Sequence, residues 1–231
     1  MKLPYRADDM SQDNFEIDHV FVCTSALAPE ANHVIDIGLS EGSLNRHPGQ
    51  GTANRRIFFK TMMLEFLWVE DAAATRSAEV RRLGLLERWQ GRKSGACPFG
   101  ICLRPSNESG QKPPFRTWEY QPAYSPVAIH VGVNSDAVDE PFLFYIPVAR
   151  KQHHASSTEP TDHPVGVRNL TGLGIRLPAY EGQSSVMKAF GELEVVTFSI
   201  AHDFLMLMSF DSGAEGRSSD FRPELPLTIS W

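Results

Sequence analysis

Two ionisable residues stand at apolar positions of β-rich segments, where they could do chemistry. In FEIDHVFVC the two-residue period of a strand places His19 on the face of Phe15 and Ile17. In MMLEFLWVED the same period places Glu65 among apolar side chains. An isolated carboxylate on such a face costs several kcal/mol or takes up a proton, so a metal, a histidine or cavity water must satisfy it.

The two residues together suggest a metal site. If both segments belong to one sheet, His19 and Glu65 project into the same hollow and supply one nitrogen and one oxygen donor for a divalent ion. The ordinary alternative is a hydrogen-bonded core histidine, with Glu65 paired to it or to an arginine. The spacing alone leaves both interpretations open.

Polar donors are concentrated in the run NRHPGQGTANRR, residues 45–56. It carries amides, a hydroxyl, an imidazole and three guanidinium groups, and its two glycines allow close backbone approach. Loops of this kind bind polar or anionic ligands, although a hairpin with solvated arginines is the alternative. The candidate ligand-binding residues are Asn45, Gln50, Asn54 and Arg55. His47 and Glu65 are the candidates for moving a proton.

Further histidines and the cysteines add less. His130, in SPVAIHVGV, is a candidate third metal ligand or an exposed or capped histidine. Three cysteines in a chain whose first residues do not read as a secretory signal predict free thiols and a cytoplasmic location. The pair in CPFGIC fits no common zinc spacing.

The elements that must position these residues follow an α+β pattern. A strand near 15–24 precedes a helix at 29–38, then two or three strands reach residue 71, and a helix or broken helix follows at 72–93. Residues 168–211 again read as strand, helix and two strands. We therefore expect paired βαβββ modules whose curled, mostly antiparallel sheets surround a cleft. The predicted organisation is a polar leader (1–14), one domain (15–211, with modules 15–71 and 97–211) and a tail (212–231).

Composition excludes some functions. The net charge of −6 and the lack of a basic tract predict no nucleic-acid or anionic-membrane partner. No apolar run approaches the roughly 20 residues of a membrane span. The expected partner is a small molecule, and the apolar strand edges predict a homodimer.

At IDHVFV, HPGQGTANRRIFF and LEFLWV the sequence resembles the vicinal oxygen chelate superfamily, in its glyoxalase-like branch. The clear likeness covers residues 15–71, and 165–211 follow only the general module plan. The resemblance implies a divalent ion (Zn, Ni, Mn or Fe) held by a first-strand histidine and a last-strand glutamate, which correspond to His19 and Glu65.

This resemblance implies a function with two versions. The first is a metal-dependent lyase, isomerase or dioxygenase acting on a small oxygen-rich molecule. The alternative is a metal-free protein that binds or sequesters a small molecule and confers resistance. In 165–211 the expected ligand positions hold Leu170–Leu173 and Met206–Met208, so the second module offers no ligand there. Either His130 or a loop histidine completes the site, or the pocket holds no metal.

Overall fold

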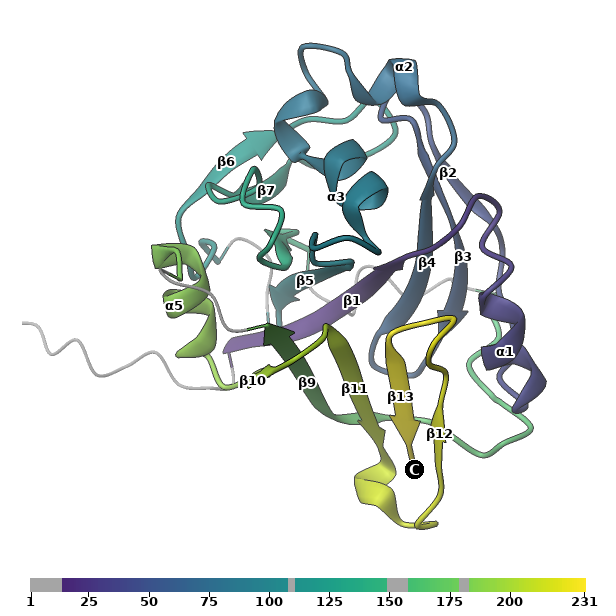
Figure 1. Cartoon of the computed structure of the whole chain (residues 1–231). Helices are drawn as coiled ribbons and strands as arrows, with labels where there is room; N and C mark the ends of the chain where they lie inside the picture. Colours follow the sequence, from purple (N-terminus) through teal and green to yellow (C-terminus); the bar gives the residue numbers. More distant parts are fainter. Residues whose placement is uncertain (1–13, 108–110, 149–157, 179–182) are drawn as a thin grey trace, which may run out of the picture.

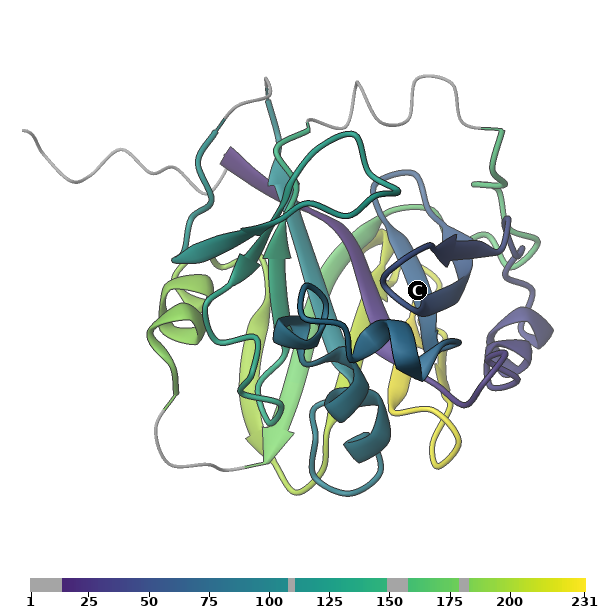
Figure 2. The same ribbon diagram turned by 90° about the horizontal axis from the view of Figure 1, so that it is seen from above.

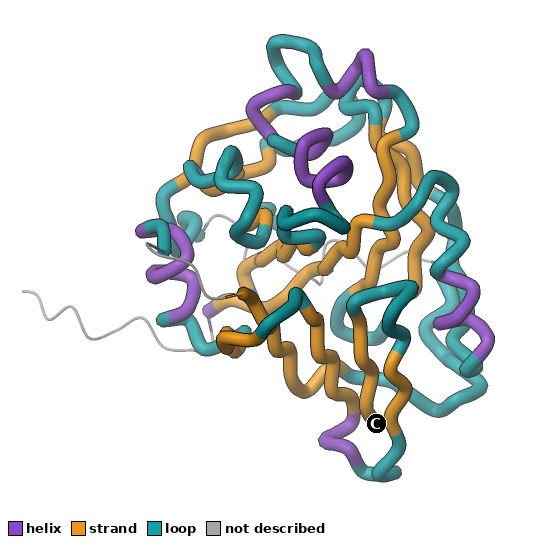
Figure 3. The backbone as a smooth tube through the Cα atoms, viewed as in Figure 1, coloured by secondary structure: helices purple, strands orange, loops and turns teal. Residues whose placement is uncertain are grey.

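Strands dominate the computed structural model, which describes residues 14–107, 111–148, 158–178 and 183–231. The predicted polar leader therefore lies almost wholly outside the described residues. Helices are short and lie at the periphery, with α1 and α5 on opposite sides of the molecule (Figures 1, 2 and 3). Among the described residues, no helix combines the length and apolar character needed to cross a bilayer. The predicted α+β class is confirmed.

The elements follow one another in the predicted order over most of the chain. The strands of the first sheet are β1 (Phe15–Cys23), β2 (Asn45–His47), β3 (Thr52–Phe58), β4 (Met63–Val69), β5 (Phe99–Pro105), β6 (Thr117–Tyr120), β7 (Ile129–Gly132) and β8 (Phe142–Tyr145). Those of the second sheet are β9 (Leu170–Pro178), β10 (Thr197–Ala201), β11 (Leu205–Phe210), β12 (Ser218–Asp220) and β13 (Leu227–Ser230). The helices are α1 (Ala31–Asp36), α2 (Ala72–Thr75), α3 (Leu85–Gly91) and α5 (Ser185–Gly191), with 3-10 turns η2 (Arg81–Leu83) and η3 (Asp211–Gly213).

The first sheet consists of two matching halves. Its order is β2-β3-β4-β1-β5-β8-β7-β6, with β1 parallel to β4, β5 parallel to β8, and β1 antiparallel to β5. Each half thus places its first strand beside its last strand, as expected for a module. The sheet curls into a half-barrel, and its second half is residues 99–146.

This arrangement corrects the predicted module boundaries. Residues 168–211 do form strand, helix and two strands, but they build the second sheet, ordered β10-β9-β11-β13-β12. The expected tail, 212–231, also joins this sheet, because β13 pairs in parallel with β11 and leaves β12 at the edge. Residues 105–125, which include β6, read as a connection because they are rich in Pro, Ser and Gly. The second half was therefore not recognised as a module.

The core lies between the two sheets. Val22 of β1 and Phe66 of β4, both fully buried, pack in one cluster with Ile175 of β9 and Met206 of β11. In Figure 1 the second sheet accordingly lies below β1. A second, smaller apolar cluster occupies the other face of the first sheet, where α3 and η2 contribute Leu85 and Leu83. Together, α2, η2 and α3 form the broken helix that was predicted for residues 72–93.

Candidate functional site

A cavity of about 660 Å³ opens on the curled face of the first sheet. One side is polar and comes from β1, β2, β3 and β4; it includes Asp18, His19, Asn45, His47, Gln50, Arg56 and Glu65. The other side is mostly apolar and includes Leu83, Leu85, Ile129, Val131, Phe142, Phe144 and Ile146. Tyr124 and its neighbours in the β6–β7 connection also line the cavity.

A β-bulge at Asp18 aims His19 into this cavity. Ile17 pairs with Leu103 and His19 pairs with Cys102, so β1 has one extra residue at Asp18. The bulge reverses the alternation of side chains. Ile17 packs on the inter-sheet core, whereas His19 lines the cavity. The expectation that the two share a face is therefore wrong.

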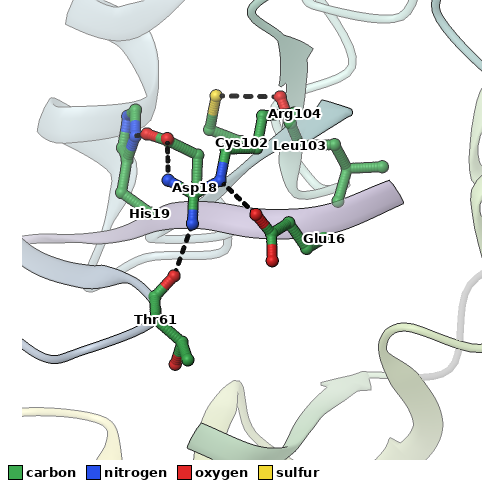
Figure 4. A network of polar contacts seen from close by, with 7 residues as sticks. All are labelled: Glu16, Asp18, His19, Thr61, Cys102, Leu103 and Arg104. Atoms are coloured by element: carbon green, nitrogen blue, oxygen red, sulfur yellow. Dashed lines mark hydrogen bonds and ion pairs between the residues drawn. The ribbon is translucent and has the colours of Figure 1, made fainter. Parts of the chain in front are cut away.

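Asp18 holds the His19 ring in place (Figure 4). Its Oδ1 lies 2.6 Å from Nδ1 of His19, and Arg104 donates from Nη1 to Asp18 Oδ2 at 2.7 Å. Arg104 is fully buried and also donates to Glu16 and to the Thr61 carbonyl oxygen. Because Asp18 occupies Nδ1, Nε2 is the ring nitrogen that remains for a metal or a substrate.

The charge state of His19 reflects these neighbours. Burial alone would lower the pKa of His19, but Cys102, Glu65 and Asp18 outweigh burial and raise it well above 6.5. Asp18, His19 and Cys102 offer donor atoms within 4.8 Å of one another. The Arg104 guanidinium already neutralises Asp18, which argues against a cation bound directly by that carboxylate.

Glu65 lies on the same wall, one strand away. Register places Phe21 of β1 and Arg56 of β3 opposite it, so Glu65 and His19 share the cavity face. Burial raises the pKa of Glu65 above 4.5, although His19 and Arg56 act in the other direction. No hydrogen bond or ion pair joins His19 to Glu65 among the described residues. Both predicted metal donors therefore face the same cavity, with Cys102 against the His19 ring and Asn54 beside the Glu65 carboxylate.

Asn54 stands on the same face of β3 as Arg56, opposite Leu67 of β4. Its side chain is fully buried, and neither amide atom has a hydrogen-bond partner among the described residues. The amide is nevertheless close enough to lower the pKa of Glu65. Asn54 thus supports the carboxylate form of Glu65 rather than lining the cavity as predicted.

A hydrogen-bonded chain fixes the rim formed by the β2–β3 hairpin. Tyr124 donates to Gln50 Oε1 at 2.7 Å, and Gln50 Nε2 donates to Thr52 Oγ1 at 2.8 Å. His47 Nδ1 lies 2.8 Å from the same hydroxyl, and its Nε2 lies 2.9 Å from Asn45 Nδ2. Burial and the charges of His19 and Arg56 lower the pKa of His47 to about 4. Neutral His47, with both nitrogens engaged, therefore orients the rim and is poorly suited to moving a proton.

A glycine locks this hairpin to the end of β4. Gly51 has φ +78°, and its carbonyl oxygen accepts hydrogen bonds from the backbone of Glu70 and Asp71. A Cβ at this position would lie 2.3 Å from the Asp71 carbonyl oxygen. The turn therefore needs a residue without a side chain.

Two predicted site residues lie away from the cavity. Arg55 points to the α1 side, where it pairs with Glu41 and donates to Asn32. His130 lies on the other face of β7, with its ring centroid 5.9 Å from that of Tyr145, while Ile129 and Val131 line the cavity. His130 is therefore not brought to His19 and Glu65.

Sequence reasoning missed Arg56, Asp18 and Tyr124. Arg56 could have been found, because Arg55 shares the face of the buried Ala53 and Ile57, which leaves Arg56 on the opposite face. The Asp18 bulge left no signal in the sequence pattern. Tyr124 lies in a long connection whose path only the fold reveals.

The two halves of the sheet are chemically unequal. Across β1 and β5, the residue opposite His19 is Cys102. Phe144 of β8 is the register partner of Cys102, as Met63 of β4 is the register partner of His19. Ile146, two residues after Phe144, therefore occupies the position that corresponds to Glu65. The second half thus offers a buried thiol and an apolar side chain instead of a second histidine and glutamate.

The half-barrel of paired modules, with a polar site on its curled face, defines a protein of the vicinal oxygen chelate superfamily. The model of the glyoxalase-like domain matches residues 17–184, and the chain belongs to this family. No curated protein matches the chain. A solved structure of a hypothetical protein from Staphylococcus aureus is similar, with 10% identity, a TM-score of 0.51, and coverage of 94% of this chain and 98% of that one. This last likeness shows the fold alone.

Proposed function

We propose that the cavity is the active site of a metal-dependent enzyme, a lyase, isomerase or dioxygenase that acts on a small oxygen-rich molecule. One observation carries the proposal. Asp18 holds Nδ1 of His19 at 2.6 Å, so Nε2 and the buried Glu65 carboxylate share one cavity wall from adjacent strands.

The residues present fit a divalent ion with open positions. A histidine that ligates a metal commonly donates its other ring nitrogen to a carboxylate, and Asp18 supplies that partner for His19. The unpartnered amide of Asn54 favours the charged form of Glu65. One imidazole nitrogen and one carboxylate oxygen suit Zn, Ni, Mn or Fe. Such an ion, when bound, polarises substrate oxygens and stabilises the negative charge that develops on them.

The chain's own residues prepare the substrate. Arg56 and Asn45 present polar atoms to a ligand's oxygens on the rim side of the cavity. Glu65, whose pKa is raised by burial, is the carboxylate placed to exchange a proton with a bound substrate. The apolar side around Phe142 and Phe144 excludes water from the reacting oxygens.

Metal titration of the purified, chelator-treated protein tests this proposal. Calorimetry with Zn²⁺ and Mn²⁺ is expected to show one site per chain in the wild type, lost in His19→Ala and in Glu65→Gln. His202→Ala is the matched control, because His202 is a surface histidine whose side chain is 96% exposed. Equal binding by all four proteins, or none by the wild type, would remove metal-dependent chemistry from the proposal.

A metal-free binding protein is the second candidate. It is favoured by Cys102 and Ile146, which stand where the second half could have supplied ligands. Thermal shift measurements with organic compounds in excess EDTA separate the candidates. Stabilisation that persists in EDTA supports binding without metal, and stabilisation that needs the ion supports the enzyme. The homodimer and the cytoplasmic location stay predictions.

A further inference from the structure

The cavity is far larger than its polar end requires. Clefts of roughly 300–1,000 Å³ hold drug-sized ligands, and this one measures about 660 Å³. A three-carbon substrate would leave most of it empty. The remaining wall is apolar and comes from β7, β8, η2 and α3, so water that fills it gains few hydrogen bonds.

The apolar wall is a packed cluster of aromatic and aliphatic side chains. Phe142 and Phe144 contact each other with ring centroids 5.2 Å apart, and Phe21 lies against both. Leu85 and Ile146 are each less than a tenth exposed and extend the same cluster. The surface presented to a ligand is thus aromatic and aliphatic, at the positions where the second half of the sheet supplies no ligand.

At the opposite side, Arg56 has a guanidinium nitrogen to spare. Its Nε donates to the Ser43 carbonyl oxygen at 2.9 Å, and Nη2 contacts the Ser43 hydroxyl and lies 3.4 Å from Glu159. Nη1 has no hydrogen-bond partner among the described residues. The guanidinium also lies over the Phe58 ring, 4.9 Å from its centroid. Arg56 is therefore held in place with one donor group left for a ligand.

The Arg56 guanidinium lines the cavity, and carboxylates lie close to it. Glu159 is the carboxylate that pairs with Arg56, at the long distance of 3.4 Å, and Glu65 stands opposite on β4. The polar side also includes His47, His19 and Asp18, and the Asp18 carboxylate is already paired with Arg104. The planar guanidinium of a fixed arginine matches a carboxylate, which it binds through charge-assisted hydrogen bonds.

We propose that the cavity binds an amphipathic carboxylic acid, with its carboxylate at Nη1 of Arg56 and an aromatic or branched apolar body against Phe142, Phe144 and Ile146. This inference rests on the proposed function only in taking the cavity as the substrate site. It does not require the ion at His19 and Glu65, since head and body are both recognised by the chain's own side chains.

Three probes test the head and the body separately: acetate, 4-phenylbutanoate and 4-phenylbutan-1-ol, each titrated by calorimetry in EDTA. 4-Phenylbutanoate is expected to bind at least about tenfold more tightly than either of the others, because acetate lacks the body and the alcohol lacks the charge. Comparable affinities for acid and alcohol, or for acid and acetate, overturn the proposal. So does the lack of saturable binding by 4-phenylbutanoate.

Variants locate each contact. Arg56→Gln is expected to bring the acid to within about threefold of the alcohol, with Arg56→Lys retaining part of the preference. Ile146→Asn is expected to reduce the advantage of the acid over acetate, and Leu85→Asn serves if the first variant does not fold. Arg46→Gln, on the exposed outer side of the same hairpin, is the matched control. A preference unchanged in Arg56→Gln overturns the assignment of the head.

Metal titration without any probe keeps the two proposals apart. Loss of metal binding with the acid preference intact removes the proposed chemistry and leaves the ligand class. Metal binding at His19 and Glu65 without a preference for the acid removes the proposed ligand class and leaves the proposed chemistry.

Discussion

Oδ1 of Asp18 lies 2.6 Å from Nδ1 of His19, although consecutive residues of a regular strand point to opposite faces. The β-bulge at Asp18 makes this contact between neighbours possible, because it re-aims the side chains that follow it. The contact fixes which ring nitrogen of His19 faces the cavity. Arg104, which also donates to Glu16, then holds the aspartate from behind (Figure 4).

Replacing Asp18 should weaken metal binding without removing a ligand. Asp18→Asn is expected to lower Zn²⁺ affinity by about 10–100-fold, as loss of a carboxylate partner of a metal-bound histidine typically does. Glu16→Gln is the control, since Glu16 pairs with the same Arg104. Competition titrations with a chromogenic chelator give both affinities. Equal losses in the two variants would show that the ion network, not the His19 contact, sets the affinity.

Removing Arg104 should destabilise the fold. Its guanidinium is fully buried and pairs with Asp18, which is 2% exposed. Arg104→Gln leaves that carboxylate uncompensated, so the free energy of unfolding should fall by about 3–5 kcal/mol. Arg46→Gln breaks an ion pair with Glu70 at the surface and should change it by no more than about 1 kcal/mol. Urea unfolding curves compare the two, and similar small losses would contradict a stabilising role for the buried network.

Much of the first half of the sheet could be predicted from the sequence. Strong alternation and turn chemistry gave β1, α1, β3 and β4 nearly in place, because each is set by local pattern. The grouping of β5 to β8 into a second half could not be predicted. Its strands β6 and β7 are four residues each and stand among Pro and Gly residues, so long-range pairing rather than local preference defines them.

The candidate site divides in the same way. His19, Glu65, Asn45, His47 and Gln50 all line the cavity, since inward polar residues on strands and a donor-rich hairpin are visible in the sequence. Arg56 could be distinguished from Arg55 by the alternation along β3, which puts Arg55 on the face of Ala53 and Ile57. His130 was predicted because histidine is a common metal ligand, but its side chain lies on the face of β7 opposite to Ile129 and Val131, which line the cavity. Asp18 needed the bulge, which no alternation pattern reveals.

The rim histidine should make stability fall in acid. Burial and neighbouring charges lower the pKa of His47 to about 4 from an ordinary 6.5. Between these pH values the unfolded chain takes up a proton that the folded chain refuses, so His47 lowers stability as pH falls through this window, by at most about 3 kcal/mol. The loss of stability from pH 7 to pH 4.5 should therefore be smaller in His47→Gln. Parallel curves for both proteins would refute the assignment.

A side chain at Gly100 should disturb the cavity floor. Gly100 lies opposite Phe21 across β1 and β5, and an added Cβ would meet the Phe21 ring at 2.0 Å. Gly100→Ala should lower the free energy of unfolding by about 1–3 kcal/mol through overpacking. Gly191→Ala is the control, because no atom lies within 4 Å of its added Cβ, and it should be neutral or stabilising. If both substitutions are neutral, Phe21 does not press on Gly100.

The account depends most on whether one ion binds between His19 and Glu65. Crystals grown with Zn²⁺ and measured on both sides of the zinc absorption edge test this directly. The account predicts a single strong anomalous peak in the cavity, within about 2.0–2.2 Å of Nε2 of His19 and of a Glu65 carboxylate oxygen. A fully occupied peak elsewhere, or none in the cavity, would contradict it.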